Sequence, residues 1–168
     1  GAVVMNAGAY GGEMKDVLKD VTVMTGEGEV RVIPAAELEM GYRTSIIKKA
    51  GYLVLGATIS LKEGNLEEIK TLTRELSEKR TSKQPLEFPS AGSTFKRPEG
   101  YFAAALIEEC GLKGFTIGGA QVSEKHSGFV INRGHATFED VMAVVNEVKR
   151  VVLEKKGVEL ECEMLILQ

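Results

Sequence analysis

Residues 137–157 read TFEDVMAVVNEVKRVVLEKKG and predict the clearest helix of the chain, over residues 138–156. Thr137 is a favourable N-cap, and Glu139 and Asp140 suit the positive end of the helix dipole. Valines recur at helical spacing and form an apolar stripe, and the final glycine suits the helix end. We expect this helix to pack on a sheet, which makes the fold class α+β.

Working outward, the preceding sequence predicts both strands and helices. Alternating valines around a Gly-containing turn predict a hairpin over residues 20–33, and the β-branched, apolar run at 52–61 predicts a buried strand. Leucines and an isoleucine at helical spacing predict a helix over residues 65–80. A second helix is expected over residues 100–110, with Phe102 facing inward.

The rest of the chain is expected to contribute short strands. The Gly-rich residues 112–122 hold one short strand at most, and residues 128–132, GFVIN, read as another. In residues 158–168 apolar side chains alternate with glutamates. Such alternation predicts a terminal strand with one exposed face.

A polar stretch containing prolines around residues 81–90 predicts a linker. We therefore expect residues 1–82 and 83–157 to form separate units, with residues 158–168 as a terminal strand.

Composition excludes several classes of protein. The 168 residues carry a net charge of -3 without a basic cluster, which argues against a nucleic-acid surface. Apolar runs fall short of the roughly 20 residues of a membrane span, and no signal peptide is visible. Cys110 and Cys162 lack the spacing of a metal or redox pair, and low cysteine usage suits a reducing cytoplasm. His126 and His135 lack partners at ligand spacing, so no metal is expected.

Two glycine-containing loops are candidate sites. Asn6, Ala7, Gly8, Ala9, Tyr10 and Gly11 form a turn whose small residues allow close approach of a ligand to the backbone, although spacing alone favours a plain tight turn. In GSTFKRP, residues 92–98, Ser93 is accessible, and Lys96 and Arg97 could meet phosphates. A loop with solvated charges remains the alternative.

Two further residues are candidates with open alternatives. Arg43 beside Tyr42 suits either a carboxylate clamp or a surface cation–π pair. Glu163 could act as a general acid or base only where its surroundings tune its pKa; otherwise it is a solvated strand residue.

Taken in order, five motifs resemble those of the UDP-N-acetylenolpyruvoylglucosamine reductase family. They are GAVVMNAGAYGGE, GYRTSII, PSAGSTFKRP, GLKGFTIGGAQVSEKHSGFVIN and LECEMLI. The resemblance covers nearly the whole chain. It implies a vanillyl-alcohol-oxidase-type flavoenzyme that reduces UDP-N-acetylglucosamine enolpyruvate to UDP-N-acetylmuramate with FAD, using NADPH as reductant, in peptidoglycan synthesis.

The resemblance also implies roles for individual residues. Ser93 matches the family's proton donor, and Arg43 and Glu163 match the pair that stabilises the enolate-like intermediate. Asn6 through Gly11 match the flavin-contacting turn. The positions of the family's substrate-binding residues are matched more loosely by Lys96, Arg97, Lys113, His126 and Asn132.

The resemblance places a first FAD subdomain before Gly1. Residues 1–82 then read as the remaining part of the FAD-binding region, residues 83–157 as the UDP-sugar domain, and residues 158–168 as a strand returning to the FAD region. We therefore expect weak FAD binding by this chain. Two alternatives are another flavoenzyme of the superfamily, against which GSTFKRP argues, and a non-catalytic nucleotide-sugar binding module.

Overall fold

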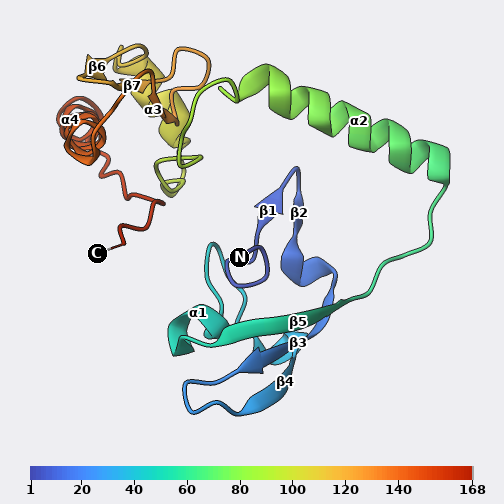
Figure 1. Cartoon of the computed structure of the whole chain (residues 1–168). Helices are drawn as coiled ribbons and strands as arrows, with labels where there is room; N and C mark the ends of the chain where they lie inside the picture. The colour runs from blue at the N-terminus through green and yellow to red at the C-terminus, as the bar shows by residue number, and fades with distance from the viewer. Residues whose placement is uncertain (168) are drawn as a thin grey trace. The chain divides into compact units, whose positions relative to one another are not determined.

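The computed structural model describes residues 1–167, which form two compact units that meet in sequence between Asn65 and Leu66 (Figure 1). Both units contain helices and antiparallel strands, so the α+β class is confirmed. None of the helices in residues 1–167 is long and apolar enough to cross a membrane. The first unit contains β1 (Gly8–Ala9), β2 (Gly12–Glu13), η1 (Met14–Asp16), β3 (Leu18–Met24), β4 (Val30–Pro34), η2 (Ala35–Glu37), α1 (Ile46–Ala50) and β5 (Leu53–Ile59).

The centre of the first unit is a three-stranded antiparallel sheet in the order β4-β3-β5. The predicted hairpin is confirmed, because β3 and β4 pair directly with Val21 opposite Ile33. One face of the sheet packs against a small core. That core consists of Leu18, Val21, Val23, Leu38 and Ile47.

The predicted strand at 52–61 exists as β5, but the prediction that it is buried is wrong. Leu53 and Leu55 are 57% and 51% exposed, whereas Val54 between them is half-buried. Val54 lies opposite the buried Val23 and is the one residue of β5 that is not exposed, and the pairing skips Leu55 at a bulge. An apolar run does not reveal this exposure, because every residue in it looks suited to a core.

The second unit combines helices with a small antiparallel sheet of order β6-β7-β8. Its core is larger than that of the first unit and joins α3, α4, the sheet and the end of the chain through residues such as Ile107, Val122, Val148 and Leu160. Its elements are α2 (Leu66–Lys83), α3 (Ala103–Glu109), β6 (Thr116–Ile117), β7 (Ala120–Val122), β8 (Val130–Asn132) and α4 (Phe138–Lys156).

Helix α4 begins and ends where the sequence predicts. The Thr137 side chain accepts a hydrogen bond from the Asp140 N–H at 3.1 Å, and the Asp140 carboxylate accepts one from the Thr137 N–H at 3.1 Å. Gly157 closes the helix in the left-handed conformation. The buried stripe consists of Val144, Val145, Val148 and Val152.

Two predictions about the second unit are wrong. Phe102 is 61% exposed rather than inward-facing, because it precedes α3, which begins at Ala103. The Arg97 guanidinium carbon lies 4.0 Å from the centre of the Phe102 ring. The Gly-rich residues 112–122 hold two short strands, β6 and β7, rather than one. Gly118 and Gly119 form the turn between them, where Asp140 and the backbone of Gly134 leave no room for a Cβ.

Residues 158–164 are not the regular strand that alternation predicts. A single isolated bridge pairs Phe95 with Cys162, although Leu160 is fully buried and Cys162 and Met164 pack on the core of the second unit. The alternation therefore gives the burial of Leu160 and Cys162 correctly, but Glu163, predicted on the exposed face, is half-buried, and the predicted strand is not formed.

Helix α2 covers the predicted helix at 65–80 and extends to Lys83. None of its 18 residues is buried. The boundary between the compact units lies before this helix, whereas the predicted boundary of 82/83 lies at its end. The assignment of residues 1–82 to an FAD region is not tested by this boundary and stays a prediction.

Candidate functional site

The segment that carries Ser93 extends the small sheet of the second unit along the edge of β8. Ser90 forms a bridge with Ile131, and the Asn132 N–H donates to the Pro89 carbonyl at 2.9 Å. Thr94, which is buried, donates its N–H to the Gly128 carbonyl at 2.9 Å. Its hydroxyl oxygen accepts the Val130 N–H at 2.9 Å. These bonds fix the backbone on either side of Ser93.

The end of the chain lies along the other edge of this segment. The Glu163 N–H donates to the Thr94 carbonyl at 2.9 Å, and the Lys96 N–H donates to the Glu161 carbonyl at 2.8 Å. The backbone thus places Glu163 opposite Thr94, next to Ser93. Ser93 is exposed and Glu163 is half-buried. Two predicted catalytic residues, separated by 70 positions, therefore lie on neighbouring segments.

The predicted substrate-binding cations are held by weak partners at the surface. Lys96 forms an ion pair with Glu161, and Lys113 forms one with Glu108 at 2.7 Å. Exposed pairs of this kind contribute at most about 1 kcal/mol, so an anionic ligand could exchange with either glutamate. Arg97 lies over the Phe102 ring and donates to the Tyr101 carbonyl at 3.3 Å.

Asn132 and His126 both support loop structure. The Asn132 side-chain oxygen accepts the N–H groups of Gly134 and Ala136 at 3.0 and 3.1 Å and shapes the turn before α4. The His126 Nδ1 accepts the Gly128 N–H at 3.1 Å, and its ring meets the Phe129 ring edge-on at 4.9 Å. Burial lowers the pKa of His126 below its ordinary value.

The Gly-rich turn in the first unit is stabilised by the buried side chain of Asn6. Asn6 donates to the Glu13 carboxylate at 2.7 Å and to the Gly41 carbonyl at 3.2 Å, and its oxygen accepts the Lys15 N–H at 3.0 Å. Its side chain is therefore committed to the protein and positions the turn. Tyr10 and Gly11 take left-handed backbone conformations at the tip.

Arg43 lies in the first unit on a turn joined to that same Asn6. Its backbone is left-handed, with φ of 55°, and its guanidinium lies 5.0 Å from the centre of the Tyr42 ring. The charge of Arg43 helps to lower the pKa of Glu13, after the hydrogen bonds from Lys15 and Asn6. Ser93 and Glu163 belong to the second unit, so only these two of the predicted catalytic residues are brought together within one unit.

Sequence reasoning missed Glu13, Thr94 and Gly128, which hold the candidate loops in place. The sequence motifs contain all three residues, but only their hydrogen bonds in the structure show that they stabilise these loops. Within residues 1–167, no three His, Cys, Asp or Glu side chains cluster in a way that could hold a metal ion.

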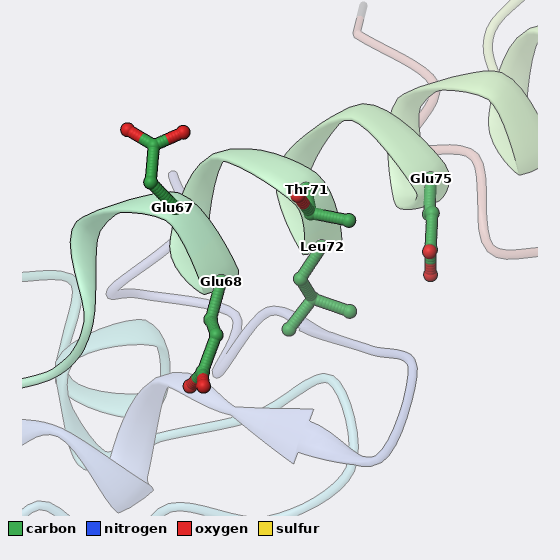
Figure 2. A pocket seen from close by; sticks show the side chains of 5 residues that line it. All are labelled: Glu67, Glu68, Thr71, Leu72 and Glu75. Atoms are coloured by element: carbon green, nitrogen blue, oxygen red, sulfur yellow. The ribbon is translucent and has the colours of Figure 1, made fainter.

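Figure 2 shows a shallow hollow of about 370 Å³ along α2, away in sequence from every predicted site residue. Glu68, Leu72 and Glu75 point to the same side of the helix there. Carboxylates dominate the lining, which disfavours a diphosphate or any other anion. We therefore do not assign the candidate site to this hollow. The lining residues are Glu67, Glu68, Thr71, Leu72 and Glu75.

Comparison with known proteins first defines the class. The family model for the C-terminal domain of UDP-N-acetylenolpyruvoylglucosamine reductase matches residues 84–167, which include Ser93 and Glu163. The crystal structure of that reductase from Thermus caldophilus is similar with a TM-score of 0.83 and 40% identity, over 97% of this chain and 58% of that one. Residues 84–167 of the second unit thus match the C-terminal domain of this reductase.

Curated relatives extend the match to the first unit. The UDP-N-acetylenolpyruvoylglucosamine reductase of Lachnoclostridium phytofermentans is 56% identical over 99% of this chain and 54% of its own length. That of Clostridioides difficile is 55% identical over 99% of this chain and 55% of its own length. The chain belongs to the UDP-N-acetylenolpyruvoylglucosamine reductase family, and it spans about half the length of these relatives.

Proposed function

We propose that this chain supplies the UDP-sugar site and the proton donor of a flavin-dependent reductase that converts UDP-N-acetylglucosamine enolpyruvate to UDP-N-acetylmuramate for the cell wall. The observation that carries the proposal is the pairing of the Ser93 segment with the Glu163 segment through the 2.9 Å bond to the Thr94 carbonyl. Membership of the family supports it.

In this proposal Ser93 donates its hydroxyl proton to the substrate carbon beside the one that gains a hydride. A serine hydroxyl is a poor acid in water, so the transfer requires a strongly basic carbon within hydrogen-bond reach. Ser93 suits this role because its side chain is exposed while its neighbour Thr94 is anchored on both edges.

Arg43 and Glu163 stabilise the charge that develops on the enolpyruvyl group. A fixed cation stabilises a transition state most where negative charge develops, which here is the substrate carboxylate. An arginine guanidinium suits this role because it is planar and can meet a carboxylate through two parallel hydrogen bonds. Glu163 would stabilise the same charge only by donating a hydrogen bond from a protonated carboxyl group, because an ionised carboxylate would repel it.

The turn from Ala7 to Gly11 would hold FAD through its backbone. It is rich in small residues and largely exposed, so it fits a role in which N–H groups approach a ligand closely. Asn6 fits a supporting role, because its three hydrogen bonds fix the turn from beneath. When bound, FAD reduced by NADPH would supply the hydride.

Lys96, Arg97 and Lys113 would meet the diphosphate of the UDP-sugar. Each is a surface cation whose present partners are exposed or are backbone and ring groups. His126 and Asn132 would lie at the edges of this site and shape it, since both stabilise turns beside β8.

Ligand titration of the 168-residue chain tests the substrate half of the proposal. Calorimetry should detect UDP-N-acetylglucosamine enolpyruvate and UDP, and Lys96→Ala together with Lys113→Ala should weaken both. Flavin fluorescence and an absorption spectrum should show little FAD on this chain. Tight, stoichiometric FAD binding would show that this chain holds the whole cofactor site, contrary to the expectation of weak binding. Joining the chain to the part of a relative that it does not cover gives a full-length chimaera; substrate binding without reductase activity there would favour a non-catalytic nucleotide-sugar module.

A further inference from the structure

The loop of residues 123–129 forms a closed unit between β7 and β8. Ser123 accepts the N–H groups of Lys125 and His126 at 3.2 Å each on its hydroxyl oxygen. The Ser123 N–H donates to the Phe129 carbonyl, and the Phe129 N–H donates to the His126 carbonyl. Further, the Ser127 hydroxyl donates to the Ala104 carbonyl of α3 at 2.6 Å.

The His126 imidazole completes this loop from inside. Its Nδ1 accepts the Gly128 N–H, so that nitrogen carries no proton, and the neutral ring then holds its proton on Nε2. The ring lies close to Gly128, because a Cβ at that position would be 3.0 Å from the imidazole and would force the ring to shift slightly. The Phe129 ring packs on the imidazole edge-on.

Gly128 also links this loop to the segment that contains Ser93, the candidate proton donor. Its carbonyl accepts the Thr94 N–H at 2.9 Å, and Thr94 follows Ser93 directly. The backbone of one residue, Gly128, therefore connects the imidazole to the Ser93 segment. A turn held by a side-chain acceptor loosens when that acceptor is lost.

We propose that neutral His126 is a positioning residue. It fixes the backbone of Gly128, and the hydrogen bond from Thr94 to Gly128 then positions Ser93. Protonation of Nδ1 would replace the acceptor by a donor facing the Gly128 N–H, so acid would release the loop and misplace Ser93. The inference rests on the proposed function only for the role of Ser93.

The charges around His126 support the neutral form. Burial is the main cause of its lowered pKa, and the ammonium groups of Lys113 and Lys83 act in the same direction. A hydrogen bond between the imidazole and the His126 backbone opposes them, as does the charge of Glu108 of α3. Lys125 and Glu124 flank the ring in sequence. A histidine with a lowered folded-state pKa stabilises the fold above its ordinary pKa, and this contribution is lost as the pH falls towards the lowered value.

A matched pair of variants tests the inference on the 168-residue chain. His126→Asn retains a short side-chain acceptor able to receive the N–H two residues on, and it cannot titrate in this range. His126→Phe retains a ring against Phe129 and removes the acceptor. NMR should show slow exchange of the Thr94 and Gly128 amides in the native chain and in His126→Asn, and faster exchange by about tenfold or more in His126→Phe.

The pH dependence separates positioning from packing. The Thr94 amide shift should follow the titration of His126 in the native chain and stay flat in His126→Asn. Nitrogen shifts of the native imidazole should report the Nε2–H form at neutral pH. An Nδ1–H form, or a Thr94 amide unaffected by both substitutions, would overturn the inference without any variant having to be active.

Activity can be read in a chimaera that joins this chain to the part of the Lachnoclostridium phytofermentans relative that it does not cover. There, His126→Phe should lower kcat roughly 10- to 100-fold, as expected for a small misplacement of a reacting group, and His126→Asn should restore it. If the amide results hold while Ser93→Ala remains fully active, the proposed role of Ser93 fails and the positioning of the segment stands. Equal kcat in both His126 variants would overturn the inference itself.

Discussion

The Ser90–Phe95 segment and the Asn6–Gly12 turn both carry predicted site residues, but they are fixed by different means. The first is hydrogen-bonded along both edges, to the β7–β8 region and to residues 161–163. The second depends on the side chain of Asn6, which ties it to Glu13, Lys15 and Gly41.

The difference suits the two proposed tasks. A side chain that delivers a proton must be placed to a fraction of an ångström, and backbone bonds on both edges provide that precision. A turn that offers N–H groups to a cofactor needs a fixed backbone and small residues. One buried amide can supply the former while leaving the surface of the turn open.

The largest expected effect is chemical and involves Ser93. In the full-length chimaera, Ser93→Ala should slow re-oxidation of the reduced enzyme by the enolpyruvyl substrate by roughly 10²–10⁴-fold, because the general acid is lost. Reduction by NADPH should stay nearly normal. Stopped-flow absorbance measures both half-reactions. Arg43→Ala and Glu163→Ala should show the same pattern, and normal turnover of Ser93→Ala would remove the mechanistic assignment.

Asn6→Ala should destabilise the first unit by about 1–3 kcal/mol, because the three hydrogen bonds of this buried side chain are lost. Asn6 also has a left-handed φ of 44°, which alanine tolerates poorly. Asn6→Gly removes the same hydrogen bonds without that strain, so it should be less damaging than alanine. Chemical denaturation measures the two values, and equal losses would show that backbone strain contributes little.

Thr94→Val should cost about 1–2 kcal/mol in the second unit, because the buried Val130 N–H loses its acceptor. Thr94→Ser keeps the hydroxyl and serves as the control. Denaturation followed by a probe in the second unit should separate them. If valine is as stable as serine, the hydroxyl contributes nothing to holding the segment.

The smallest effect is a local pH response of the turn. Hydrogen bonds from Lys15 and Asn6 lower the pKa of Glu13 below its ordinary 4.5, so the ionised carboxylate stabilises the folded turn. This stabilisation is present above pH 4.5 and is lost as the pH falls through the lowered value. Amide shifts of Ala7–Gly11 should move in that acid range, and Glu13→Gln should abolish the movement.

Sequence predicted the elements whose signals are local. Helix α4 follows its cap, its valine stripe and its final glycine. The predicted burial of β5 was wrong, because burial depends on whether other elements cover the strand, and no local sequence pattern states that. The terminal segment was misread for a related reason, since a regular strand needs a longer pairing partner than the single bridge at Phe95.

The candidate site divides in the same way. Ser93 and Glu163 were named from motifs, and the structure places their segments side by side. The roles of Thr94 and Gly128 were invisible, because a hydrogen bond between positions far apart in sequence leaves no local trace. Arg43 remains a prediction from the motif.

Helix α2 bears on how this chain responds to proteases. An 18-residue helix without a buried side chain draws its stability mainly from local hydrogen bonds, and isolated helices of this length are marginal in water. Lys70, Arg74 and Arg80 lie exposed along it. Brief trypsin treatment should therefore cut within α2 first and release a carboxyl-terminal product that keeps the core around α4, so the digestion pattern would reveal which part of the chain folds by itself.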